Sequence, residues 1–451
     1  MALSASELFF QYSGNPVAKI LGRIFLILLC VFIAPSFKLR EWVLLIVASS
    51  LAIGLYATEN GPADILFALD RAAFFAAFIY LVTLLKEAAE RSVSVLKLGT
   101  YLTKQPAGRR YYSLAFGGHL MGVLLNFGAI SLLTPLIQRG ARSGEDLKTN
   151  GILEQQQISA LLRGFSWMIM WSPTALTQAV LFTAFPQIDL SIIITLGISS
   201  AIVMIFLGRM EDRFRWRNVA IPNHVEEPEF PTRSACRFFI ICLSLVLLTA
   251  GIVYSANVSA AIALMLVAPF IMCAWIFEHE YNGGFGSSLQ LTVKKLNSIL
   301  TKSSQVLGKS AVVLGAAGFI GEAAAKLAPV DLLAHSLQVL NVPSWALLIS
   351  LPIIINLCGQ IALSPILVVV FLSSVLNQLP VLPADPNLIV FALGAGWALS
   401  MSASPNASAT LLISGISGIA PTTLTWKWNG VYALLCLLVF SLAFVVLDSV
   451  F

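Results

Sequence analysis

Charged residues are scarce in this chain. Of its 451 residues, 11% are Asp, Glu, Lys or Arg, whereas an average soluble domain has about 25%. Hydrophobic residues make up 58% of the chain, and many of them stand in runs with the length of membrane-spanning helices, about 17 to 25 residues. The composition therefore predicts an all-α polytopic membrane protein and excludes an ordinary soluble domain.

Residues for several kinds of chemistry are also sparse. The six cysteines and four histidines do not stand at the spacings of a metal site. The sequence has no Gly-x-x-x-x-Gly-Lys-Ser/Thr loop for nucleotide phosphates. We therefore expect neither an enzyme nor a metal or organic cofactor. The net charge of +5 gathers in particular loops, so it indicates membrane topology rather than nucleic-acid binding.

Two apolar segments are interrupted by a proline between polar residues. The first contains Ser172-Pro173-Thr174, and the second, in the other half of the chain, contains Ser404-Pro405-Asn406. Proline inside a helix removes a backbone donor and clashes with the preceding turn. Hydroxyl and amide groups beside it are costly in hydrocarbon unless they face protein, water or a ligand. We therefore predict two broken transmembrane helices, over about 158–185 and 386–412, whose breaks line a cavity.

Each broken segment follows an apolar segment that has polar residues near its centre. Asn126 and Gly128 interrupt the segment at about 111–137, whose two flanks are both rich in Arg and Lys. A segment with the same kind of flank at both ends is expected to enter the membrane and return to the same side. We therefore predict a re-entrant hairpin there and a second at about 343–377.

The two halves of the chain show these features in the same order. Asn126 lies nine residues before Pro135, and Asn356 lies nine residues before Pro365. The number of residues between the two Asn–Pro pairs is nearly the same as the number between the two proline breaks. Interrupted segments at matched positions in two halves are typical of the binding site of a transporter with internal repeats. The sequence therefore predicts a repeated hairpin and a repeated broken helix.

A charged segment separates the two halves. Placing its arginines in the cytoplasm puts most other Lys and Arg residues of the loops on the same side, as the positive-inside rule requires. The first hairpin then opens to the inside and the second to the outside, so the repeats are inverted. We predict repeat 1 at 1–208, a cytoplasmic linker at 209–235 and repeat 2 at 236–451, each repeat with five spans, in the inner (plasma) membrane.

The segment from Leu124 to Pro135 resembles the hairpin signature of the ion transporter superfamily, which includes arsenite/antimonite efflux permeases and divalent anion–sodium symporters. The two proline breaks resemble the unwound helices that follow each hairpin there. The resemblance implies a static scaffold, a moving transport domain that works as an elevator, and a homodimer. The symporters carry Ser-Asn-Thr at each tip, whereas this chain has Asn126-Phe127-Gly128 and Asn356-Leu357-Cys358-Gly359-Gln360, so the resemblance does not extend to a dicarboxylate substrate.

The candidate site consists of neutral polar residues at the tips and breaks. Helix N-termini suit anions, and unwound carbonyls with Asn and Ser oxygens suit Na⁺. The residues expected to line one central site for substrate and ion are Asn126, Gly128, Ser172, Thr174, Asn356, Gln360, Ser404 and Asn406. A second rank consists of Thr134, Thr177, Ser364 and Ser408.

Three ionisable residues in apolar segments have alternative interpretations. His119 is a candidate for proton coupling, because its free pKa lies near neutrality, or a packed, hydrogen-bonded histidine. Glu322 is the other proton-coupling candidate, or it forms an interfacial salt bridge with Lys326. Arg163 either attracts an anion or extends its head group to the membrane interface.

These features predict a secondary active transporter. We expect it to carry a small organic anion across the inner membrane, coupled to Na⁺ or H⁺, by elevator-type alternating access. The expected partners are the anionic substrate, the coupling cation, the lipid bilayer and a second copy of the chain. The alternatives are an efflux permease for an oxyanion or toxic compound, a lipid-handling membrane protein or membrane-embedded enzyme, and a channel.

Overall fold

The computed structural model describes residues 1–90, 92–141, 147–219, 229–281 and 284–451, and these parts of the chain contain helices and no strands. The prediction of an all-α membrane-type protein is confirmed. Residues 220–228 of the predicted linker 209–235 lie outside the described residues. The linker's first seven residues continue the helix α10.

The helices of the first half have the following bounds: α1 Ala2–Ser13, α2 Pro16–Ile33, η1 Ala34–Ser36, α3 Leu39–Tyr56, α4 Gly61–Glu90, α5 Val93–Thr103, α6 Ala107–Leu125, α7 Phe127–Ala141, α8 Leu147–Met168, α9 Leu176–Ala184 and α10 Leu190–Arg215. Those of the second half are α11 Thr232–Ala256, α12 Ala260–Glu280, α13 Phe285–Lys302, α14 Ser304–Lys326, α15 Val330–Val339, α16 Ser344–Gln360, α17 Pro365–Gln378, α18 Pro386–Ala403, α19 Ser408–Ser417, the π-helix η2 Thr423–Asn429 and α20 Gly430–Asp448.

Nine helical stretches within the described residues are long and apolar enough to cross a membrane, whereas two five-span halves predicted ten. One of the nine is the second broken helix, Pro386–Ser417. The first broken helix, predicted at about 158–185, is not among them, because α8 begins at Leu147 and its first eleven residues are mostly polar. The polar first half of α8 contains Gln and Glu side chains.

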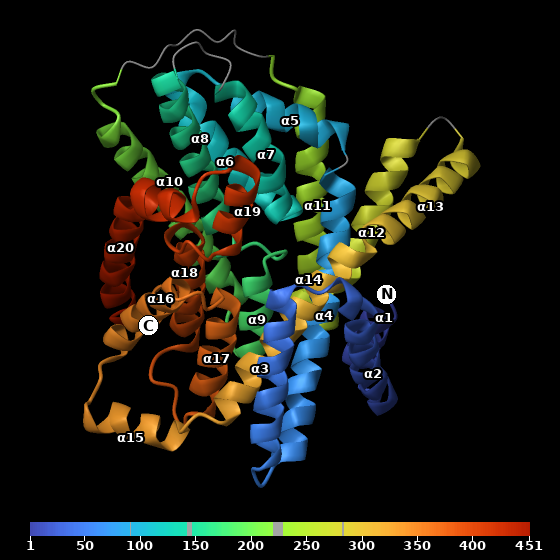
Figure 1. Cartoon of the computed structure of the whole chain (residues 1–451), viewed down its shortest axis with the longest axis vertical. Coiled ribbons are helices and arrows are strands. Elements are labelled where there is room, and N and C mark those ends of the chain that lie inside the picture. Colours follow the sequence, from blue (N-terminus) through green and yellow to red (C-terminus); the bar gives the residue numbers. More distant parts are fainter. Residues whose placement is uncertain (91, 142–146, 220–228, 282–283) are drawn as a thin grey trace.

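Two pairs of helices form hairpins. The helices α6 and α7 are joined at Asn126, which has a positive φ of 50°, and they pack against each other. The helices α16 and α17 also pack together and are joined by residues 361–364, in which Ala362 has a φ of 68°. Figure 1 shows α6 and α7 in the upper half of the molecule and α16 and α17 in the lower half. An inverted repeat requires such opposite placement, and the inversion itself stays a prediction.

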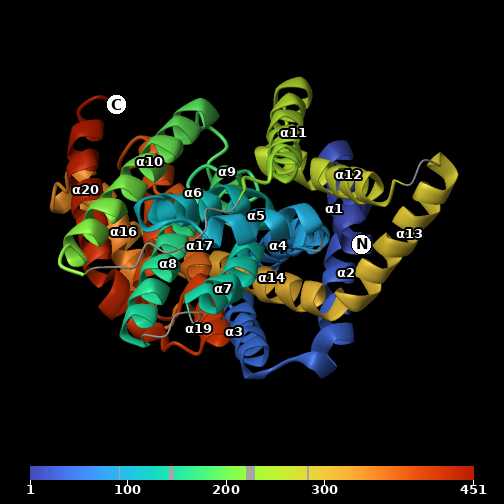
Figure 2. The ribbon, with the colours of Figure 1, turned by 90° about the horizontal axis from the view of Figure 1, so that it is seen from above.

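The hairpins are interlocked with the broken helices. The second arm of the first hairpin, α7, packs against α19 of the second half, and the second arm of the other hairpin, α17, packs against α9 of the first half. The long helices α4 and α14 pack against each other along much of their length. Seen from above, α10, α16 and α20 lie at one end of the molecule and α1, α2, α12 and α13 lie at the other (Figure 2).

Candidate functional site: two helix breaks held by hairpins

The first break lies between α8 and α9. The hydroxyls of Ser172 and Thr174 lie 2.9 Å apart, and Thr174 Oγ1 also donates to the carbonyl of Val123 on the hairpin arm α6. At the hairpin tip, Asn126 Nδ2 donates to the carbonyl of Thr174 at 3.4 Å. Backbone groups that have left a helix need such partners in the absence of water, so the hairpin holds this break in place.

The second break lies between α18 and α19 and is held by the second hairpin. Ser404 Oγ donates to the carbonyl of Gly359 at 2.6 Å. Asn406 Nδ2 lies 3.1 and 3.2 Å from the carbonyls of Gly359 and Gln360, at the end of α16. In return, Gln360 Nε2 donates to the carbonyl of Ala403 at 3.2 Å. Both breaks therefore bind the tip region of the hairpin that precedes them in the chain.

A second kind of bond closes each break along its own chain. Gln178 Nε2 donates to the carbonyl of Ile169 at 2.8 Å, and Thr410 Oγ1 donates to the carbonyl of Met401 at 3.1 Å. Gln178 and Thr410 are separated in the sequence by the same number of residues as Ser172 and Ser404. The same separation holds for the acceptors Ile169 and Met401. Neither Gln178 nor Thr410 was among the site residues predicted from the sequence. Their matched spacing was a signal that could have found them, because each lies four residues after the polar residue that follows the proline.

Two glycines let the hairpins approach the broken helices closely. A Cβ atom on Gly164 would lie 1.9 Å from the carbonyl oxygen of Ala115, and one on Gly396 would lie 2.9 Å from Cα of Pro352. The sequence separation between Gly164 and Gly396 equals the separation between the two breaks, but the separation between Ala115 and Pro352 is larger. Equivalent residues in the first arms of the two hairpins are therefore separated by more residues than the two breaks are. The smaller separation, which the two Asn–Pro pairs predicted for the hairpins, was wrong.

The corrected offset changes which residues are equivalent. Asn126 lies at the tip of its hairpin, whereas Asn356 lies one turn before the end of α16. Asn356 Nδ2 donates to the carbonyl of Gly396 at 3.4 Å, while His119 Nδ1 lies 3.0 Å from the carbonyl of Gly164. The structural counterpart of Asn356 is therefore His119. The prolines differ as well, because Pro135 lies inside α7 and Pro365 is the first residue of α17.

Both ring nitrogens of His119 have partners. Nδ1 contacts the carbonyl of Gly164, and Nε2 lies 3.0 Å from Nε1 of Trp171. A carbonyl can only accept and an indole N–H can only donate, so His119 is neutral and carries its proton on Nδ1. A second proton on Nε2 would break the bond from Trp171, and proton coupling through His119 stays a prediction.

The two halves of the candidate site differ in accessibility. The buried residues are Asn126, Gly128, Thr134, Ser172, Thr174, Thr177 and Ser404; Asn356, Gln360, Ser364 and Asn406 are half-buried and Ser408 is exposed. Three buried oxygens of the two hairpins and α9 have no hydrogen-bond partner among the described residues, namely Thr134 Oγ1, Gln178 Oε1 and Asn356 Oδ1. The exposed part of the candidate site therefore lies mainly at the second hairpin, whereas Ser404 at the second break is as buried as Ser172 at the first.

Glu322 is bound to the second hairpin. The residue is 6% exposed, and its carboxylate accepts a hydrogen bond of 2.8 Å from Ser374 on α17. The alternative of a salt bridge to Lys326 was wrong, because Lys326 pairs with Asp64 at 3.5 Å. The α4–α14 contact brings Asp64 to the same end of the bundle as Lys326. Glu322 thus remains a candidate for proton coupling.

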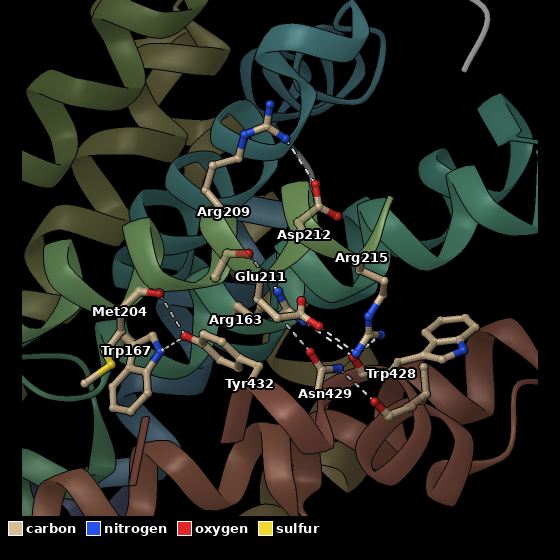
Figure 3. Close-up of polar contacts among 12 residues, drawn as sticks. Arg163, Trp167, Met204, Arg209, Glu211, Asp212, Arg215, Trp428, Asn429 and Tyr432 are labelled. Atoms are coloured by element: carbon tan, nitrogen blue, oxygen red, sulfur yellow. Dashed lines mark hydrogen bonds and ion pairs between the residues drawn. The ribbon is translucent and has the colours of Figure 1, made fainter. Parts of the chain in front are cut away.

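Arg163 forms the centre of a buried network (Figure 3). The side chain is 1% exposed, and its guanidinium donates to Oδ1 of Asn429 at 2.8 Å, the carbonyl of Gly208 at 3.0 Å and the carboxylate of Glu211 at 2.8 Å. Its Cζ also lies 4.3 Å from the ring centroid of Tyr432. Both sequence interpretations of Arg163 were wrong, because α10 and η2 pack around α8 and supply these acceptors.

The π-helix η2 connects this network to the second hairpin. Trp426 Nε1 donates to Oε1 of Gln360 at 2.9 Å, and Arg215 Nη1 donates to the carbonyl of Trp428 at 2.7 Å. Single turns of π-helix are rare and are frequent at functional sites. No feature of the sequence indicated η2, because a π-helix has no compositional pattern of its own.

Two solved structures share this fold. The YdaH transporter of Alcanivorax borkumensis, described as having an unusual topology, matches with a TM-score of 0.62 and 15% identity, over 90% of this chain and 98% of that one. MtrF of Neisseria gonorrhoeae, described as illuminating a class of antimetabolite efflux pumps, matches with a TM-score of 0.58 and 14% identity, over 90% and 94%. No family model and no curated protein matches the chain. The chain therefore has the fold of membrane transporters.

Proposed function

We propose that the chain is a secondary active transporter of a small organic anion across the inner membrane, coupled to Na⁺ or H⁺. The observation that carries this proposal is the repeated arrangement in which each helix break is bound to its own hairpin. Discontinuous helices of this kind form the substrate and ion sites of secondary transporters with internal repeats. The fold shared with YdaH and MtrF supports transport in general. We also propose membership of the ion transporter superfamily, on the hairpin and break motifs.

The anion would bind where the short helices begin. The helices α9 and α19 have no side-chain cap, so the N–H groups of their first residues, Leu176 and Ser408, remain available at the breaks. A helix N-terminus carries partial positive charge and binds anions. The residues 169–175 and 404–407 contain no charged side chain. A site without charged side chains that contains two such helix N-termini supports a small anion as the substrate.

The coupling cation has two candidate sites. Na⁺, which prefers neutral oxygen ligands in such breaks, would bind the unpartnered Oε1 of Gln178, whose side chain spans the first break. Glu322 would bind H⁺ at the hairpin arm α17, where Ser374 contacts its carboxylate. The variant Glu322→Gln separates these cases, because it abolishes H⁺ coupling and leaves Na⁺ coupling intact.

Alternating access would follow an elevator mechanism. The contacts of α7 with α19 and of α17 with α9 join both hairpins and both broken helices into one unit, which would be the moving transport domain. The helices at the other end of the molecule, α1, α2, α12 and α13 (Figure 2), would belong to the static scaffold of a homodimer.

A second candidate function is the efflux of a toxic compound. The fold shared with MtrF, whose description names antimetabolite efflux pumps, favours this direction of transport. The same breaks and hairpins would then carry the compound outward. Cells that express the chain would accumulate less of the compound and survive more of it, whereas an uptake transporter would increase accumulation.

The experiment that tests the proposal has two stages. Purified protein is screened by thermal unfolding against small carboxylates, sulfonates, phosphonates and oxyanions, in NaCl or choline chloride, because a ligand of the folded state raises the unfolding temperature by mass action. Each stabilising compound is then tested in proteoliposomes under a Na⁺ or H⁺ gradient. We expect one anion class to be stabilising and to cross the membrane with the gradient. Binding without transport under either gradient would overturn the proposal.

A further inference from the structure

A cavity of about 520 Å³ lies between the N-terminal end of α6, Gln156 in the middle of α8, and the C-terminal end of α10 with the residues that follow it. None of the residues that line it belongs to the two breaks or the hairpin tips. Four of its lining residues are the arginines Arg110, Arg209, Arg213 and Arg217. This cavity is therefore separate from the candidate transport site and has a different charge.

The positive charge of the cavity is only partly balanced. Among the described residues that line it, the one carboxylate is that of Asp212, which accepts from Arg209 at 3.1 Å. Arg110, Arg213 and Arg217 have no ion pair among the described residues. Arg213 and Arg217 are exposed, so water solvates them. The cavity thus offers three guanidinium groups that form no ion pair with a described residue, while the carboxylate of Asp212 acts on Arg110 from beyond ion-pair distance.

Arg110 is the residue that indicates a missing ligand. Its side chain is 5% exposed, and Nε donates to the carbonyl of Gln105 at 3.1 Å. Its Nη1 atom is buried without a hydrogen-bond partner among the described residues. A buried donor left without a partner is costly, and more so on a charged group, so a bound anion would satisfy a group that the protein leaves unsatisfied.

The N-terminus of α6 adds to this site. Gly108, the second residue of the 19-residue helix, lines the cavity, and the helix has no side-chain cap. Helix N-termini bind phosphate and other anions through free N–H groups and the helix dipole. A helix N-terminus and an unsatisfied buried arginine from the same helix thus converge on one cavity with Arg213 and Arg217 of α10.

We propose that this cavity binds a phosphate-bearing anion. Guanidinium groups recognise phosphate oxygens through paired, charge-assisted hydrogen bonds. The volume exceeds that of a single phosphate group, and Tyr111 and Trp216 also line the cavity, so their aromatic side chains would contact the part of the molecule that carries the phosphate. The inference does not depend on the proposed transport function.

Two sources can supply this chemistry. Arg213 lies in the last turn of α10, which has the length and composition of a membrane span, and Arg217 lies just beyond it. This is the level at which basic residues meet the head groups of anionic phospholipids. A soluble phosphate compound can reach the same arginines from the aqueous side. The test therefore has one arm for each source.

The test measures binding to the purified full-length chain in neutral detergent. One arm titrates short-chain phosphatidylglycerol, with phosphatidylcholine as the neutral comparison, and the other titrates inorganic phosphate, with chloride at equal ionic strength. Stabilisation by phosphatidylglycerol alone assigns the site to a lipid, and stabilisation by phosphate as well assigns it to a soluble anion. Either outcome supports an anion site, whereas equal effects of all four additions overturn it.

Variants locate the site. We expect Arg110→Gln to weaken binding by at least about tenfold, because it removes a charge-assisted contact. The double variant Arg213→Gln/Arg217→Gln changes only exposed side chains, so it keeps its fold and should weaken binding by a similar factor. Arg233→Gln, an exposed arginine at the start of α11, is the matched control. Binding of wild-type strength by the double variant would overturn the assignment.

Discussion

Gln178 and Thr410 make the same contact at equivalent positions in the two halves of the chain. Each side chain spans its helix break and donates to a main-chain carbonyl nine residues earlier, at 2.8 Å for Gln178 and 3.1 Å for Thr410. One donor is an amide and the other a hydroxyl, so the two halves keep the contact with different chemistry. The breaks are therefore built features of the fold and not accidental kinks at prolines.

The variant Thr410→Val should impair transport more than it destabilises the protein. It keeps the shape of the side chain but removes the donor to Met401, which costs about 1 kcal/mol of folding free energy and loosens the break. The matched control is Thr249→Val, because buried Thr249 donates only within its own helix, to Leu245 at 2.7 Å. Thermal unfolding and transport are measured on both variants. Equal transport by the two variants would contradict a role for the contact.

The variant Gly164→Ala should prevent the first hairpin from packing. The added methyl group would lie 1.9 Å from the carbonyl oxygen of Ala115, and neither helix backbone can yield without losing its own bonds. Overpacking of this kind costs about 1–3 kcal/mol or more. The control is Gly151→Ala on the same helix, where nothing lies within 4 Å.

The control should be neutral or stabilise the protein by up to about 1 kcal/mol, because alanine favours the helix over glycine. Thermal unfolding in detergent measures both variants, and fluorescence-detected gel filtration measures the folded yield. A Gly164→Ala protein as stable as Gly151→Ala would show that α6 and α8 do not pack as described.

Arg163 and Glu211 should be strongly interdependent. Both are buried and their charged atoms lie 2.8 Å apart, so removing Glu211 leaves the buried charge of Arg163 without its carboxylate partner and costs about 3–5 kcal/mol. Removing Arg163 should cost less, because Glu211 keeps its ion pair with Arg215 at 2.6 Å. The double variant Arg163→Met/Glu211→Gln should be more stable than the sum of the single effects implies. The exposed pair of Arg237 and Glu278, at 3.2 Å, is the control and should contribute at most about 1 kcal/mol.

The sequence predicted the helix breaks better than the hairpins. Proline between polar residues has a direct physical effect on a helix, so the region of Ser404 to Asn406 was found from residue types alone. The tips depend on how two helices pack, and identical Asn–Pro spacings placed Asn126 and Asn356 in equivalent positions that they do not occupy. The true offset of the hairpins became visible only through contacts such as Gly164 with Ala115.

The buried network shows a second limit. The residue types of Arg163, Asn429 and Tyr432 can be read from the sequence, but the convergence of segments from opposite halves of the chain on one guanidinium group cannot. An isolated arginine in an apolar segment is compatible with interface anchoring, ligand binding or ion pairing. Only the tertiary packing decides among these three, because each of them gives the buried guanidinium charge a favourable partner.

The most direct measurement of the central claim is substrate counterflow in proteoliposomes that contain the variant Asn406→Ala. Asn406 bonds the carbonyls of Gly359 and Gln360 and thereby holds the second break to its hairpin. The control is Asn297→Ala, which changes an exposed asparagine on α13. The substrate is the anion identified by thermal unfolding. Reconstitution efficiency is measured for both variants.

If both breaks carry the transported anion, Asn406→Ala reconstitutes normally and shows no counterflow, while Asn297→Ala exchanges substrate at the wild-type rate. Loss of the contact changes the geometry of the α19 N-terminus, where the anion is proposed to bind. Wild-type counterflow by Asn406→Ala would contradict the account, because the second break would then have no part in transport.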